Sequence, residues 1–167
     1  MPIIAGTSGP SPLSSHPVDV LIRELIDTGR PVRPGEVDRI VERIATAPFD
    51  SRIIRVPTDL RGLAYQGHVL GTRENALRYH LISRVMDDQQ WASGVTETDY
   101  VDDLRRIVRS PDARIVLFFR RGGNIAGVIA PSDRGVSVDH RGVQYEPECF
   151  VVHSADRGIM THGSRKR

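Results

Sequence analysis

A histidine and an arginine lie one helical turn apart in the segment RYHLISRV. They are His80 and Arg84, at positions i and i+4, and such residues share one face of an α-helix. An imidazole titrates close to neutral pH, and a guanidinium is a permanent cation that binds phosphate oxygens well. The pair is therefore suited to cleavage of a phosphodiester bond, provided that both side chains face one cleft.

Cleavage of RNA without a metal ion needs three kinds of group. A base removes the proton of the ribose 2′-hydroxyl, an acid protonates the leaving 5′-oxygen, and cations or hydrogen-bond donors hold the transition state. DNA lacks the 2′-hydroxyl, so the chemistry is specific for RNA. His80 is the candidate base or acid, and Arg84 is the candidate phosphate binder. The alternatives are a histidine that only packs at a helix edge and an arginine that is solvated or ion-paired.

A threonine near the end of the sequence is a third candidate. Thr161, in GIMTHG, can donate a hydrogen bond to phosphate, although a β-branched strand residue with no such role is the alternative. His162 follows it and should alternate to the opposite face of the strand. We expect His80, Arg84 and Thr161 to line one cleft. A separation above about 10 Å would exclude joint action on one phosphate, because proton transfer needs hydrogen-bond distances.

Four further residues complete the candidate site. His68, in YQGHVLG, is a second candidate acid or base and a complement to His80. Trp91 and Tyr100 can stack on bases, and Arg78 can bind the substrate by its charge. For the two aromatic residues the alternative is an anchoring role in the hydrophobic core.

Signatures of other chemistries are absent from the sequence. It contains no Walker loop, no HExxH, no calcium loop and no GxSxG, and no two of its six histidines are four positions apart. The one cysteine, Cys149, excludes an intramolecular disulfide and a cysteine-based zinc site. We therefore expect no cofactor and no metal site.

Composition indicates a globular protein. The chain has 167 residues, of which 39% are hydrophobic, and a net charge of only +2. Its positive charge is nearly all arginine, which suits phosphate binding but also follows from genome composition. No apolar run approaches the roughly 18 residues of a membrane span, and no signal-peptide pattern is visible. These features predict no membrane association and a cytoplasmic site of action, with secretion as an effector left open.

The hydrophobic pattern predicts an α+β fold with N-terminal helices followed by an antiparallel sheet of about four strands. Residues 1–16 are rich in Gly, Pro and Ser and are expected to form a flexible arm. Residues 17–50 are predicted as a helical N-terminal extension, with helices at 17–28 and 35–46. The remaining domain, 51–167, is expected to contain a strand at 52–56, helices at 72–85 and 96–109, and strands at 114–120, 125–130, 150–153 and 159–161.

The arrangement over roughly residues 63–163 resembles the BECR superfamily of ribonucleases, which includes barnase, EndoU, colicin E5/D and RelE-type enzymes. It is most similar to the bacterial EndoU-like and phage-associated toxin branches. The matching motifs are RYHLISRV, QQWASGVTETDYVDDL and the closing strand pair FVVHSADRGIMTHG. One departure is the Thr-His-Gly at the end, where related toxins often have Thr followed by a small residue or Gly and then an aromatic residue.

The resemblance implies a function. It implies a metal-independent, toxin-like endoribonuclease that cleaves tRNA or other RNA by 2′-hydroxyl transesterification. A toxin of this kind implies a cognate immunity protein or antitoxin as a partner. The alternative is a non-catalytic binding or assembly module that uses the same scaffold and contacts a protein partner through its N-terminal helices. A basic nucleic-acid-binding regulator is a third interpretation, which the weak net charge disfavours.

Overall fold

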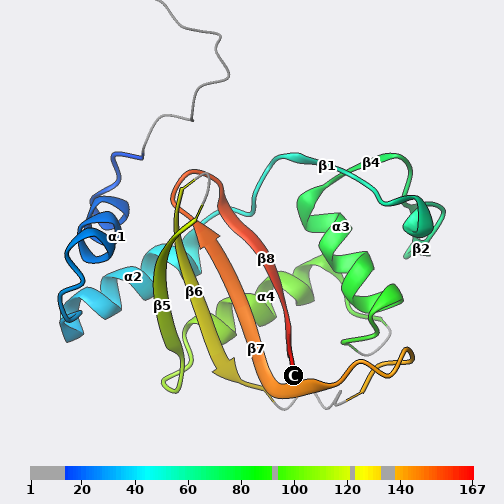
Figure 1. Ribbon diagram of the computed structural model, residues 1–167. Helices are drawn as coiled ribbons and strands as arrows, with labels where there is room; N and C mark the ends of the chain where they lie inside the picture. The colour runs from blue at the N-terminus through cyan, green and yellow to red at the C-terminus, as the bar shows by residue number, and fades with distance from the viewer. Residues whose placement is uncertain (1–13, 92–93, 121–122, 133–137) are drawn as a thin grey trace, which may run out of the picture.

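The computed structural model describes residues 14–91, 94–120, 123–132 and 138–167. It has an α+β fold, as the sequence predicts (Figure 1). The predicted arm lies mostly outside the described residues. The larger elements in chain order are α1 (Pro17–Thr28), α2 (Pro34–Thr46), α3 (Ala76–Ile82), η3 (Ser83–Asp87), α4 (Glu97–Val108), β5 (Arg114–Arg120), β6 (Gly123–Pro131), β7 (Tyr145–Ser154) and β8 (Gly158–Lys166).

Strands β5 to β8 form one antiparallel sheet in the order β5-β6-β7-β8. Figure 1 shows α1, α2 and α4 on one face of this sheet and α3 beyond the β8 edge. Two small ribbons lie beside α3. One pairs β1 (Ile53–Arg55) with β4 (Arg73–Asn75), and the other pairs β2 (Ala64–Tyr65) with β3 (His68–Val69). A short 3₁₀ turn, η2, covers Thr58–Leu60.

The helices α1, α3 and α4 begin where a side chain accepts a hydrogen bond from one of their free N–H groups. The imidazole of His16 accepts a hydrogen bond from the Val18 backbone before α1, and Gly29 ends that helix in a left-handed conformation. The helix α4 opens with a capping box between Thr96 and Asp99, which the sequence TETD predicts.

The main core lies between the helices and the inner face of the sheet. Apolar side chains of α1 and α2 pack in it together with those of α4 and of strands β6 and β7. A buried ion pair, Arg43 Nη2 to Asp19 Oδ2 at 2.8 Å, links the first two helices. Residues 17–50, predicted as an extension, therefore share their core with the sheet of the following domain.

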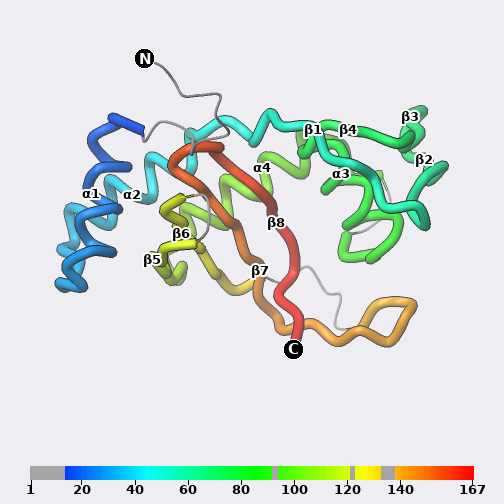
Figure 2. Tube along the Cα trace, turned by 45° about the horizontal axis from the view of Figure 1, so that its top comes forward, coloured from blue at the N-terminus to red at the C-terminus, as the bar shows by residue number. Residues whose placement is uncertain are grey.

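A stretch of chain after α2 carries the polypeptide across to α3. Figure 2 shows it passing from α2 past the β7–β8 turn to β1. Ile159 N–H donates to Pro48 O at 2.9 Å, and Asp50 N–H donates to Ile159 O at 2.7 Å. Gly158 has a φ of +83°, and a Cβ there would lie 2.3 Å from Pro48 O, so this close approach requires glycine.

The helix predicted at 72–85 starts later than expected and changes its form. Residues 73–75 pair with β1 as β4, so α3 begins at Ala76 with the Asn75 side chain as its cap. Beyond Ile82 the chain continues as the π-helical segment η3. Short π-helical segments occur often at functional sites, because the extra residue in the turn changes the direction of the side chains.

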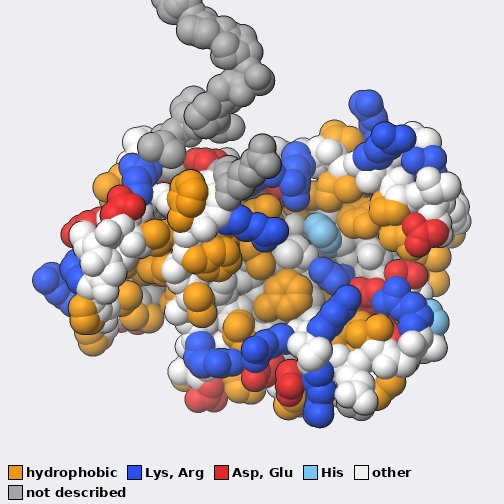
Figure 3. Space-filling view, in the orientation of Figure 1, with side chains coloured by type: hydrophobic (Ala, Val, Ile, Leu, Met, Phe, Trp, Pro, Cys, Tyr) orange, Lys and Arg blue, Asp and Glu red, His pale blue; other side chains and the backbone are white. Residues whose placement is uncertain are grey.

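Within the described residues, no helix covers the second face of the sheet over β5 and β6. Strand alternation and register place Val116, Phe118, Gly127, Phe150 and Val152 on it. Val116 is 49% exposed and Phe118 is 38% exposed. We call this the open sheet face; Figure 3 shows apolar side chains on it between groups of arginine or lysine.

No helix among the described residues is long and apolar enough to span a membrane.

Candidate active site

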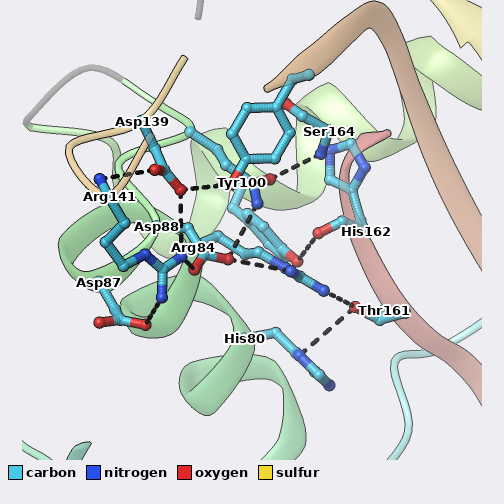
Figure 4. A network of polar contacts seen from close by, with 12 residues as sticks. His80, Arg84, Asp87, Asp88, Tyr100, Asp139, Arg141, Thr161, His162 and Ser164 are labelled. Atoms are coloured by element: carbon cyan, nitrogen blue, oxygen red, sulfur yellow. Dashed lines mark hydrogen bonds and ion pairs between the residues drawn. The ribbon is translucent and has the colours of Figure 1, made fainter. Parts of the chain in front are cut away.

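Three side chains predicted to act together meet between α3–η3 and the edge of the sheet. The hydroxyl Oγ1 of Thr161 lies 3.5 Å from His80 Nδ1 and 3.3 Å from Arg84 Nη2 (Figure 4). Arg84 donates to the hydroxyl oxygen, so the hydroxyl proton is free to point at Nδ1. These distances are far below the separation of about 10 Å that would exclude joint action. We call this group the His80–Arg84–Thr161 cluster.

The guanidinium of Arg84 rests against the open sheet face. Its Nη1 donates to Asp88 Oδ2 at 3.1 Å, and its central carbon lies 5.7 Å from the ring centre of Phe150. Gly163 makes this position accessible, because a Cβ there would lie 3.1 Å from Arg84 Nε. A glycine in β8 thus leaves the space that the guanidinium occupies beside Thr161.

Asp88 is held in place by a network that joins the end of η3 to β8 (Figure 4). Gln90 Nε2 donates to Asp88 Oδ2 at 3.0 Å, and its own Oε1 accepts from the Ser164 backbone at 2.7 Å. Arg141 donates to Asp88 and to Asp139 from the far side. Since the Asp88 carboxylate fixes Arg84, the network fixes the orientation of the guanidinium relative to the strand.

The imidazole of His80 is neutral at neutral pH. Burial, and then the charges of Arg84 and Arg52, lower its pKa to about 4. Aromatic rings contribute to this burial: the ring centre of Phe49 lies 6.5 Å from that of His80, and the ring of Tyr79 contacts it edge-on. A neutral imidazole has one nitrogen that can accept a proton, which is what a general base needs.

A β-bulge directs Thr161 into the cluster. Val152 pairs with Thr161 but His153 pairs with Ile159, so Met160 is the extra residue in β8. His162 points to the opposite face, as strand alternation predicts. It is fully buried there, with Nε2 at 2.9 Å from Asp103 Oδ2 and Nδ1 at 3.1 Å from Phe150 O.

Comparison of the chain with protein-family models, with curated proteins and with solved structures gives no match in any of the three. The interpretation of the site therefore depends on its own geometry.

The structure does not bring His68 to the His80–Arg84–Thr161 cluster. His68 lines a separate pocket of about 310 Å³ together with Arg78 and Glu97. Its Nε2 pairs with Glu74, and its Nδ1 lies 3.4 Å from Arg78 Nη1. Residues two apart on an α-helix point about 200° apart, so Arg78 and His80 face opposite sides of α3. The structure therefore places His68 and Arg78 at this second pocket and does not bring His68 beside His80, as the expected pairing of the two histidines would need.

The two predicted stacking residues also lie elsewhere. Tyr100 has no exposed surface, and its hydroxyl donates to His162 O at 2.7 Å, so no face of its ring is open to a base. Trp91 is partly exposed, and its ring centre lies 5.3 Å from that of Tyr100 and 5.2 Å from that of His162. Tyr100 anchors α4 to β8, which corrects its predicted role in substrate binding, and Trp91 packs beside it.

Several residues of the site were not predicted from the sequence. Asp88 gave a usable signal, because it lies at i+4 from Arg84. Gly163, Gln90 and Phe150 gave none, since their roles depend on the packing of η3 against β8. Among the described residues, no group of three or more His, Cys, Asp or Glu side chains is placed to hold a metal ion.

Proposed function

We propose that the protein is a toxin-like endoribonuclease that cleaves RNA by 2′-hydroxyl transesterification without a metal ion. One observation carries the proposal: His80, Arg84 and Thr161 meet within 3.5 Å from elements far apart in the sequence. Imidazole, guanidinium and hydroxyl are the groups that this chemistry needs. The resemblance of the sequence motifs to BECR ribonucleases supports the same proposal.

The cluster assigns a role to each side chain. Nδ1 of the neutral His80 accepts the proton of the 2′-hydroxyl, whose oxygen then attacks phosphorus. The bond from phosphorus to the 5′-oxygen breaks, and the 5′-oxygen takes a proton. The imidazolium of His80 is the member of the cluster best able to supply that proton. The products are a 2′,3′-cyclic phosphate and a 5′-hydroxyl end. Arg84 donates hydrogen bonds to the phosphate oxygens. The Thr161 hydroxyl turns its one proton from Nδ1 to the phosphate when the substrate is bound, which leaves Nδ1 free to accept.

Binding of the substrate would raise the pKa of His80 toward the pH at which the protein works. The charges of Arg84 and Arg52 contribute to the low pKa of the free protein. A phosphodiester anion beside these arginines offsets their effect and raises the pKa of His80. General base catalysis is most efficient when the pKa of the base lies near the operating pH. A low pKa of His80 in the free protein is therefore compatible with its role as the general base, because bound substrate makes the imidazole a stronger base.

The exposed apolar side chains of β5 support a protein partner. On the open sheet face, Val116 is 49% exposed and Phe118 is 38% exposed. Exposed apolar patches of this kind are typical of interaction sites. For a toxin acting on tRNA or other RNA in the cytoplasm, the partner would be an immunity protein or antitoxin that covers the open sheet face. The second candidate function, a non-catalytic binding or assembly module, is favoured by the same patch.

Cleavage of RNA in EDTA tests the proposal. We would incubate purified tRNA and a mixed RNA with wild-type protein, with His80→Ala and with His140→Ala. His140 is an exposed histidine outside the cluster, so its variant is the matched control. The proposal expects discrete cleavage by wild type and His140→Ala, and a loss of about 10²- to 10⁴-fold for His80→Ala.

Two outcomes would contradict the proposal. Full activity of a folded His80→Ala variant would remove the assigned base. No cleavage by well-folded wild-type protein would favour the binding module, and the exposed face of β5 would then be the place to search for its partner.

A further inference from the structure

Two arginines face each other directly on the small ribbon beside α3. Arg55 in β1 pairs with Arg73 in β4, so the two side chains lie on the same face of the ribbon. Both residues are exposed. Figure 3 shows arginine or lysine side chains gathered above β1 and β4.

This pair is unfavourable for folding. Like charges directly opposite each other on antiparallel strands destabilise the pairing. Within the described part of the chain, neither arginine has an ion pair or side-chain hydrogen bond. Glu74, which follows Arg73 in the sequence, alternates to the other face of the ribbon and pairs with His68. An anion from outside the protein would remove the repulsion between the two guanidinium groups.

The pair is close to the His80–Arg84–Thr161 cluster along the chain. β4 runs directly into α3, and His80 is seven positions after Arg73. A rise of 3.3 Å per strand residue and 1.5 Å per helix residue gives a path of about 16 Å between their Cα atoms. An RNA chain that leaves the scissile bond covers such a distance within a few nucleotides.

We infer that Arg55 and Arg73 clamp a second phosphate of the RNA substrate, away from the bond that is cleaved. The inference rests on the proposed function. Two guanidinium forks about 5 Å apart at Cβ can both donate to the oxygens of one phosphate. Ile53 is on the same face of the ribbon and 61% exposed, so it offers an apolar contact to the adjoining sugar or base.

Salt dependence of RNA binding tests the clamp. The probe is a fluorescent 2′-O-methyl oligoribonucleotide, which cannot undergo transesterification, and anisotropy is measured over a range of KCl concentrations. The logarithm of the binding constant falls with the logarithm of salt concentration by about 0.7 for each single-strand phosphate neutralised. For the double variant Arg55→Gln/Arg73→Gln we expect the slope to fall by about 0.7 and affinity to drop about tenfold. Arg39→Gln, an exposed arginine on α2, is the control and should leave both unchanged.

A charge reversal separates the clamp from a structural role. Arg55→Glu replaces a repulsive cross-strand pair by an attractive one, so we expect a higher melting temperature together with weaker RNA binding. A purely structural pair would not change these two properties in opposite directions. An unchanged slope and affinity in the double variant, with wild type binding RNA, would overturn the clamp and leave the proposed function intact. Failure of wild-type protein to bind or cleave RNA would overturn both.

Discussion

Gly163 lies directly beside the guanidinium of Arg84, the proposed phosphate binder, and adding one methyl group there should impair cleavage. An alanine Cβ at this position would lie 3.0 Å from Gln90 Oε1, 3.1 Å from Arg84 Nε and 3.3 Å from Arg84 Cζ. Comfortable contacts between such atoms are about 3.5–4.0 Å. Gly163→Ala therefore pushes the guanidinium away from β8 by a few tenths of an ångström.

The size of the effect follows from a neighbouring hydrogen bond. Arg84 Nη2 donates to Thr161 Oγ1 at 3.3 Å, and Thr161 belongs to the strand from which the guanidinium is pushed. A shift of about 0.4 Å takes this contact beyond the usual range. Loss of a hydrogen bond to a charged group costs about 1.5–3 kcal/mol. If that loss falls on the transition state, kcat/KM decreases about 10- to 100-fold.

Steady-state cleavage of a fluorogenic oligoribonucleotide in EDTA measures this effect, with circular dichroism to confirm folding. Gly127→Ala is the matched control, since Gly127 lies on the same sheet face and its Cβ would meet Phe118 at an ordinary 3.7 Å. The control should retain nearly wild-type activity. Wild-type activity in Gly163→Ala would show that the placement of Arg84 against β8 does not matter for catalysis, which would refute the reasoning.

Three further predictions concern stability and protonation. Burial lowers the pKa of His153 to about 4, so the free energy of unfolding is highest above pH 6.5 and decreases as the pH falls toward 4. In urea titrations, His153→Leu should reduce the loss of unfolding free energy between pH 7 and pH 5 by about 1–2 kcal/mol. An unchanged loss would contradict this prediction. Gly158→Ala should destabilise the protein by at least about 3 kcal/mol, clearly more than Gly142→Ala. Gly142 has the same φ of +83°, but a Cβ there would meet no atom within 4 Å. Equal effects of the two variants would contradict the close approach of Gly158 to Pro48. Arg52→Gln should raise the pKa of His80 from about 4 toward its ordinary value in an NMR titration; a value that stays at about 4 would contradict the role of the Arg52 charge.

Local patterns were enough to predict most of the fold. The helix at 17–28 and the strand at 114–120 have the predicted bounds, because strong apolar periodicity and clear caps or turns define them. The helix predicted from residue 72 was wrong at its start. Arg73 to Asn75 pair with β1 instead, and a strand pairing of this kind depends on a segment some 20 residues earlier in the chain.

The site was predicted in part, for a related reason. Strand alternation separated Thr161 from His162, and helical spacing joined His80 to Arg84. The prediction for His68 failed because its position depends on which side of α3 the β2–β3 ribbon packs, and no short-range pattern determines this. Tyr100 was assigned to the substrate although its apolar ring and hydroxyl are both satisfied in the core.

The most direct test of the central claim compares one RNA sequence with the same sequence carrying a single 2′-deoxy nucleotide at the cleavage site, in EDTA. Mass spectrometry of the products identifies their ends. We predict that wild-type protein leaves a 2′,3′-cyclic phosphate and a 5′-hydroxyl on the RNA and does not cut at the 2′-deoxy position. Cleavage of the substituted oligonucleotide at the same rate, or products that carry a 5′-phosphate, would contradict the assigned chemistry of the His80–Arg84–Thr161 cluster.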